Sequence, residues 1–259
     1  MDAPKIFTPE YYERMRLLED ASWWNAGMRD VAAHVLALAN LPASGILLDV
    51  GCGSGQTMRW FHRIRPGWRT VGLDVAPEGL AAATALGVRS VMRASALHIP
   101  LRTASVDLVI TLDVLQHLPL AGGDRQAMNE VARVVKPGGH VFVRTNAQSF
   151  PHTRDDEEFQ FRKYQTPQLR ARFEEAGFDV VRLSRVNSVL GLAEIPRELR
   201  ARHQPHSYHG ILSEPRREPA WRSTVKRRWL ALEGRAIRMG LRWPIGRSIV
   251  ALSRRRSPL

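Results

Sequence analysis

The chain alternates short apolar runs with longer stretches in which apolar residues recur at helical spacing. Runs that are apolar almost throughout predict strands buried on both faces, as in a parallel sheet. We expect strands at 46–50, 70–74, 88–92, 106–112, 140–145, 179–186 and 247–253. Helical stretches lie between most of them, so the pattern predicts an α/β fold with helices on both faces of one mostly parallel sheet.

Helix start and stop signals mark the elements between these strands. Helices are expected after Gly55, at 77–87, 127–135 and 166–177, and at 221–243 before the last strand. Two more precede the first strand, one beginning at 8–10 and one at 28–40. Trp23 and Trp24 lie between these two, and because adjacent residues cannot both face one core, at least one is available to cover a ligand.

The stretch from Ile46 to Met58 carries the chemistry. Asp49 stands near the end of the first strand, and glycines follow at the alternate positions 51, 53 and 55. Missing Cβ atoms let a ligand lie against the backbone, where the amides of a helix N-terminus face it. The spacing is G-x-G-x-G, which argues against the G-x-G-x-x-G of dinucleotide sites. A glycine turn that serves packing alone is the alternative.

A second acid, Asp74, ends the next strand about 20 residues after the last glycine, where a carboxylate can bind a ribose diol. The motif D-x-G-C-G-x-G together with Asp74 resembles the class I S-adenosylmethionine (SAM)-dependent methyltransferases, especially the small-molecule enzymes of the type 11-like group. The resemblance covers nearly the whole chain. It implies a Rossmann-like seven-stranded sheet, an N-terminal helical lid, SAM as cofactor and S-adenosylhomocysteine as product.

The resemblance also implies which residues surround SAM. Those at the glycine turn, the ribose acid, the adenine loop and the end of the fourth strand are Asp49, Gly51, Cys52, Gly53, Gly55, Asp74, Val75, Ser95, Ala96, Leu112 and Asp113. Ser95 stands where relatives have an acid, which weakens the expected contact with adenine. The W-W segment implies that Trp24 belongs to a lid and that Arg29 lies near the SAM carboxylate. A helix that packs on the sheet edge is the alternative.

His117 follows the fourth strand and is a candidate general base, because the pKa of histidine lies nearest neutrality. A purely structural histidine is the alternative. The resemblance to an H-x-R-R-Y type element suggests His152 and Tyr164 as acceptor contacts. No metal site is expected: the acids 155–158 indicate a solvated turn, and Pro205 interrupts the spacing of His203, His206 and His209.

The net charge of +13 is concentrated near the end of the chain. Residues 1–190 hold 22 Lys and Arg against 20 Asp and Glu, whereas residues 191–259 hold 16 against 5. The catalytic core is therefore nearly neutral, which disfavours a nucleic-acid partner. Cys52 is the one cysteine, so a disulfide framework is excluded. Without a signal-like start or a membrane-length apolar run, a cytoplasmic protein is expected.

We expect a single domain over residues 1–259. Its parts are an N-terminal lid (1–42), a SAM-binding core (43–186), a basic helical insertion (187–245) and a last strand with tail (246–259). In the insertion, Trp221, Val225, Trp229, Leu232 and Ala236 share one helix face beside arginines. This pattern predicts that 221–243 contacts an anionic membrane surface or covers an acidic, partly apolar acceptor. Packing of that face on the sheet is the alternative.

The predicted function is methyl transfer from SAM to a small-molecule acceptor, at oxygen, in the biosynthesis of a specialised metabolite, a sugar or a lipid-linked intermediate. A tRNA or rRNA methyltransferase is one alternative, and a noncatalytic SAM-fold binding protein is another. The sequence leaves the identity of the acceptor and the oligomeric state open.

Overall fold

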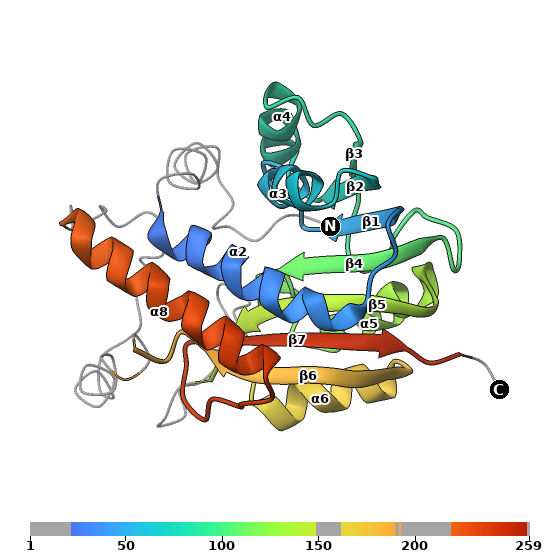
Figure 1. Cartoon of the computed structure of the whole chain (residues 1–259). Helices are drawn as coiled ribbons and strands as arrows, with labels where there is room; N and C mark the ends of the chain where they lie inside the picture. The colour runs from blue at the N-terminus through green and yellow to red at the C-terminus, as the bar shows by residue number, and fades with distance from the viewer. Residues whose placement is uncertain (1–21, 149–161, 190–191, 193–218, 258–259) are drawn as a thin grey trace.

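The structure is a computed structural model that describes residues 22–148, 162–189, 192 and 219–257. Its centre is a seven-stranded sheet in the order β3-β2-β1-β4-β5-β7-β6 (Figure 1). The strands are β1 (Gly45–Val50), β2 (Trp68–Asp74), β3 (Val91–Arg93), β4 (Val106–Leu112), β5 (Val135–Asn146), β6 (Phe178–Val186) and β7 (Ser248–Arg255). Only β7 runs antiparallel to its neighbours, so the predicted mostly parallel sheet is confirmed.

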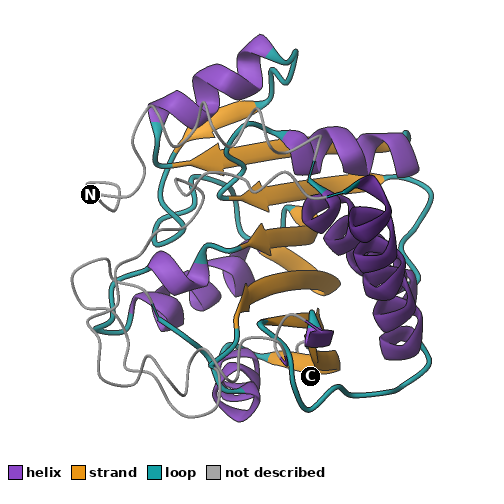
Figure 2. Cartoon of the chain, turned by 90° about the vertical axis from the view of Figure 1, so that its left-hand side faces the viewer, coloured by secondary structure: helices purple, strands orange, loops and turns teal. Residues whose placement is uncertain are grey.

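Helices cover both faces of the sheet (Figure 2). On one face α2 (Trp23–Leu36), α3 (Gln56–Ile64) and α8 (Ala220–Arg238) share a core cluster with side chains of β1, β4, β5 and β7. On the other, α5 (Gly123–Val134) and α6 (Thr166–Glu175) pack over β4, β5 and β7. Helix α4 (Pro77–Ala85) packs beside β2 and β3, and two short 3₁₀ turns are η1 (Ala37–Ala39) and η2 (Leu115–His117).

The continuous apolar runs follow from this layering. Leu47 and Leu108 face the α2 and α8 side, whereas Leu48 and Val109 face the α5 side, and all four are 0% exposed. A central strand buried on both faces needs apolar side chains at every position, not at alternate ones.

Several predicted boundaries are wrong by a few residues. The helix predicted at 28–40 begins at Trp23, because the Ser22 side chain caps it by accepting from Asn25 N. Both tryptophans therefore lie on α2. Helix α5 begins at Gly123 rather than 127, β5 begins at Val135 rather than 140, and β3 is confined to three residues. The helix predicted to begin at 8–10 lies outside the described residues.

Helix α8 ends earlier than predicted, and the predicted alternative in which its apolar face packs on the sheet is wrong. It ends at Arg238 because Gly240 takes a φ of +111° and Leu241 N donates to Ala236 O (3.0 Å), a Schellman ending. Its buried residues are Leu230, Glu233, Gly234, Ala236 and Ile237. Of the predicted apolar face only Ala236 is buried, whereas Trp221, Val225, Trp229 and Leu232 are exposed.

Close packing against α2 explains this choice of face. The two helices run side by side (Figure 1) in parallel, with Gly27 against Leu230 and Val31 against Gly234. A Cβ on Gly27 would lie 2.6 Å from Leu230 Cδ1, and one on Gly234 would lie 2.9 Å from Val31 Cα. These glycines let the helices approach, so the Gly234 face packs inward. No helix in the described part of the chain is long and apolar enough to cross a membrane.

Candidate functional site

The carboxyl ends of β1, β2 and β4 meet at one edge of the sheet, where ligands bind in open α/β folds. The turn after β1 is held in left-handed conformations, with φ of +76° at Gly51, +49° at Gly53 and +75° at Gly55. Gly51 N and Cys52 N both donate to Leu73 O, at 2.8 and 3.0 Å, which fixes the turn against the end of β2. Packing also requires one glycine here, since a Cβ on Gly51 would lie 2.2 Å from Val114 Cγ2.

Asp74 joins this turn to the end of β2. Its Oδ2 accepts from Gly53 N (2.8 Å) and its Oδ1 from Ala76 N (2.9 Å). Burial raises the pKa of Asp74, and the backbone donors at Ala76 and Gly53 counter part of that rise. The backbone of Val75 is a third donor to this carboxylate. Because a carboxylate has about four acceptor positions, at least one further donor, such as a ribose hydroxyl, can be bound. Val75, which follows Asp74, is half-buried.

Asp49, near the end of β1, and Cys52, within the glycine turn, are both buried. Burial, followed by the charges of Asp49 and Asp74, raises the pKa of the Cys52 thiol far above its usual range. Because a thiol is nucleophilic only as a thiolate, Cys52 is a small packing residue in this position.

The loop after β3 carries Ser95 and Ala96. Ser95 Oγ accepts from Leu97 N (3.2 Å), which leaves its O–H as a donor, and Ala96 is buried. Helix α5 holds the loop in place: Glu130 Oε2 accepts from Ile99 N (2.8 Å), and Arg133 donates to Ile99 O (2.7 Å). The loop is thus rigidly placed beside β2, which adjoins the glycine turn.

At the end of β4, Asp113 takes a φ of +59° and forms an ion pair with Arg144 of β5. Arg144 Cζ lies 4.6 Å from the ring centroid of Trp24. The sequence interpretation missed Arg144, although an arginine near the end of an apolar strand was a signal. Leu112 is half-buried beside this pair. Arg29 is half-buried on α2, and its contact with a SAM carboxylate stays a prediction, as does that of Trp24.

His117 closes the 3₁₀ turn after β4, and its backbone N donates to Val114 O (2.9 Å). Burial lowers the pKa of His117 to about 4, although the charge of Asp113 acts in the opposite direction. The imidazole is therefore neutral at physiological pH and can accept a proton, but it is a weak base.

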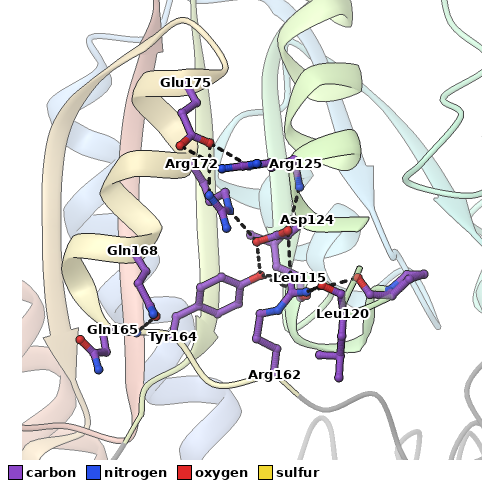
Figure 3. A network of polar contacts seen from close by, with 11 residues as sticks. Leu115, Leu120, Asp124, Arg125, Arg162, Tyr164, Gln165, Gln168, Arg172 and Glu175 are labelled. Carbon is purple, nitrogen blue, oxygen red and sulfur yellow. Dashed lines mark hydrogen bonds and ion pairs between the residues drawn. The ribbon is translucent and has the colours of Figure 1, made fainter. Parts of the chain in front are cut away.

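Tyr164 lies within a polar network centred on the buried Asp124 (Figure 3). Its hydroxyl contacts Asp124 Oδ2 and Leu115 O, both at 3.3 Å, while Arg162 and Arg172 pair with Asp124 at 2.9 and 2.8 Å. Burial would raise the pKa of Asp124, but Arg172 and Arg162 outweigh it and lower that pKa. This geometry favours a scaffold role for Tyr164, and its contact with an acceptor stays a prediction.

The remaining predicted positions are not placed. His152, the acids 155–158 and His203, His206 and His209 lie outside the described residues. Within the described ranges, no three His, Cys, Asp or Glu side chains lie close enough to hold a metal ion.

A family model matches the part of the chain that contains the glycine turn. Residues 48–143 match the family model described as a methyltransferase domain. The chain is similar to a tRNA (carboxymethyluridine(34)-5-O)-methyltransferase of Arabidopsis thaliana, with 32% identity over 106 residues, 41% of this chain and 25% of the relative. It is also similar to a ubiquinone biosynthesis O-methyltransferase of Cronobacter sakazakii, with 34% identity over 113 residues, 40% of this chain and 44% of the relative.

Among solved structures, phosphoethanolamine N-methyltransferase 2 of Haemonchus contortus, in complex with SAM, has the same fold. The TM-score is 0.64 at 15% identity, over 98% of this chain and 58% of that one. The chain thus spans less than two thirds of the length of these relatives.

Proposed function

We propose that this chain, whose residues 48–143 form a domain of the class I SAM-dependent methyltransferases, transfers a methyl group from SAM to a small-molecule acceptor. The observation that supports the proposal is that two sets of candidate site residues lie at the same edge of the sheet. The glycine turn with Asp74 ends β1 and β2, and Asp113 with His117 follows the adjacent β4.

The residues at this edge fit SAM. The turn presents backbone and no side chain larger than that of Cys52, and Asp74 retains acceptor capacity for the ribose diol. Ser95 keeps an O–H that can donate to a ring nitrogen of adenine. When bound, SAM supplies an electrophilic methyl carbon on a sulfonium.

The protein's own task is to align the acceptor and exclude water. Trp24 and Arg144 form a wall on the α2 side of this edge, next to Asp113. His117 would accept the proton of an acceptor hydroxyl. A base with the low pKa of His117 is strong enough to take this proton, because the hydroxyl becomes strongly acidic once its oxygen begins to bond to the methyl carbon.

We propose methylation at oxygen, of a specialised metabolite, a sugar or a lipid-linked intermediate. The similarity to an O-methyltransferase of ubiquinone biosynthesis supports this class of reaction. The similarity to a tRNA methyltransferase favours RNA as the second candidate, but that relative is matched over a quarter of its length and the core is nearly neutral. A noncatalytic SAM-binding role is the third candidate, favoured by Ser95 in the place of an acid. A cytoplasmic location, with peripheral contact of 221–243 with an anionic membrane, belongs to the same proposal.

Replacement of Asp74 tests the site. Asp74→Ala should weaken SAM binding by roughly 1–3 kcal/mol, because the ribose hydroxyls lose a charged acceptor. Calorimetry with SAM and with S-adenosylhomocysteine measures the change, and Asp179→Ala, an exposed acid on β6, is the matched control. Equal affinities for the two variants would contradict the assignment. Turnover of labelled SAM with metabolite extracts, and salt-dependent retention on RNA, separate the three candidate functions.

A further inference from the structure

We infer that the outer face of α8 docks this protein onto an anionic lipid surface. An apolar stripe runs along α8 on the side opposite the buried Leu230 and Ile237. Trp221 is 64% exposed, Val225 57%, Leu232 56% and Met239, just past the helix end, 78%. At 100° per residue these four lie within about 40° of one another, whereas Leu230 and Ile237 lie on the other side. Within the described part of the chain the stripe is thus largely exposed, whereas Leu230 and Ile237 are packed inward.

Positive charge surrounds the stripe. Arg228 and Arg235 lie on the same side of the helix as the stripe, between its apolar residues. Arg222 lies beside the stripe. All three arginines are exposed. The one acid in α8, Glu233, is 0% exposed and faces inward. The outer surface of α8 thus carries cations and apolar side chains with no anion of its own.

This composition identifies the occupant. Lipid headgroups pair with arginines while tryptophan and aliphatic side chains enter the acyl boundary, so a mixed row suits an anionic membrane. A second copy of the chain docked through the same stripe would bring two rows of arginines together, which charge repulsion disfavours. An RNA would leave Val225, Leu232 and Met239 without a partner.

The stripe also lies close to the candidate site. Lys226 lies 5.1 Å from the ring centroid of Trp23, while the next residue, Trp24, covers Arg144 near the carboxyl end of β5. Because α2 and α8 run parallel, Trp221 and Val225, which precede Lys226, lie beyond the first residues of α2. Figure 1 shows the start of α8 on the side toward which β4 and β5 point. A lipid surface on the stripe would adjoin the carboxyl edge of the sheet. This consequence rests on the proposed function, where it favours a lipid-linked acceptor.

Co-sedimentation with vesicles tests the inference on the full chain. The protein should bind phosphatidylcholine vesicles that contain 30% phosphatidylserine, but not pure phosphatidylcholine, and release as salt rises, because exposed charges are screened over about 10 Å at 0.1 M. Arg228→Glu with Arg235→Glu should lower the partition coefficient by more than tenfold, at about fivefold per charge removed. Trp221→Ser with Leu232→Ser should do so without a change of charge.

Arg63→Glu with Arg69→Glu is the matched control, since both residues are exposed, lie on α3 and β2, and change the net charge equally. The control should bind vesicles to within about threefold of the wild type. Quenching of tryptophan fluorescence by spin-labelled lipid should be reduced in Trp221→Phe. SAM affinity, measured on every variant, should be unchanged, so loss of docking is distinguished from failure of the proposed function.

Three outcomes would overturn the inference. They are equal binding by the stripe variants and the control, retention on RNA without binding to anionic vesicles, and a stripe-dependent dimer that binds neither vesicle type.

Discussion

Glu233 is expected to be the strongest single polar link between α8 and the sheet. It is 0% exposed, and its carboxylate accepts four donors. Oε2 accepts from Asn187 N (2.6 Å), and Oε1 accepts from Ser188 N (2.9 Å), Ser188 Oγ and Trp229 Nε1 (2.6 Å). The carboxylate therefore ties the end of β6 to the middle of α8, where α8 packs on α2.

Replacement by alanine would leave all four donors without this acceptor. An unsatisfied buried donor costs about 1–3 kcal/mol, and a hydrogen bond to a charged group contributes about 1.5–3 kcal/mol. Relaxation around the smaller side chain offsets part of the sum over four donors. We expect Glu233→Ala to lower the free energy of unfolding by about 3–5 kcal/mol. Glu233→Gln keeps the volume and one acceptor oxygen but turns an NH₂ group toward a donor, so a loss of about 1–3 kcal/mol is expected.

Urea unfolding followed by tryptophan fluorescence measures these changes. Glu174→Gln is the matched control, because Glu174 is an exposed helix carboxylate paired with Arg170, and its loss should cost no more than about 0.5 kcal/mol. If Glu233→Ala unfolds within about 1 kcal/mol of the wild type, the four donors have other partners and the reasoning fails.

Three further predictions concern the site and its scaffold. The pKa of Asp124 is lowered in the folded protein, so its stabilising contribution is present above the unfolded pKa of about 3.9 and is lost as pH falls through the lower folded pKa. The difference in free energy of unfolding between the wild type and Asp124→Asn should therefore be constant above about pH 5 and shrink below about pH 4. Urea titrations measure it. His117 has a pKa of about 4 in the folded protein against about 6.5 in the unfolded chain, so it binds fewer protons when folded. The free energy of unfolding of the wild type should therefore fall by up to about 3 kcal/mol between pH 6.5 and 4, and His117→Gln should lack this pH dependence. Identical pH profiles for the two proteins would refute the burial argument. Gly51→Ala should destabilise the protein by more than Gly87→Ala in thermal melts. At both positions an alanine in the left-handed φ costs about 1–2 kcal/mol, but only at Gly51 would the new Cβ also lie 2.2 Å from Val114 Cγ2. Equal losses of stability would mean that the turn relaxes to accept the Cβ.

Local signals sufficed for the core of the fold and for the strand ends that carry the candidate site. The runs 46–50 and 106–112 became β1 and β4 with almost the same bounds, because strands buried on both faces must be apolar throughout. Asp74 was expected at a strand end and is there, since the chain spacing between a glycine turn and the next strand is fixed by one crossover helix. These features depend on neighbours in sequence, so sequence was enough.

Contacts between distant residues lay beyond such signals. Arg144 became part of the site through Asp113, 31 residues away, and through Trp24. The hydroxyl of Tyr164 contacts Asp124, 40 residues away, a partner that the sequence did not indicate. A side chain's type and spacing along the chain do not determine which partner the fold brings to it.

The clearest division between sequence and tertiary structure is in α8. The sequence alone predicted a basic amphipathic helix at 221–243, because periodicity and charge are local properties, and the structure confirms the helix over Ala220–Arg238. One of the interpretations drawn from the sequence, packing of the apolar row against the sheet, is wrong, because Trp221, Val225, Trp229 and Leu232 are exposed. Only the tertiary structure decided that Gly234 and Leu230 pack inward, because Gly27 and Val31 of α2, about 200 residues away, leave room for a close approach on that side alone. The apolar row was thereby left facing outward, among its arginines.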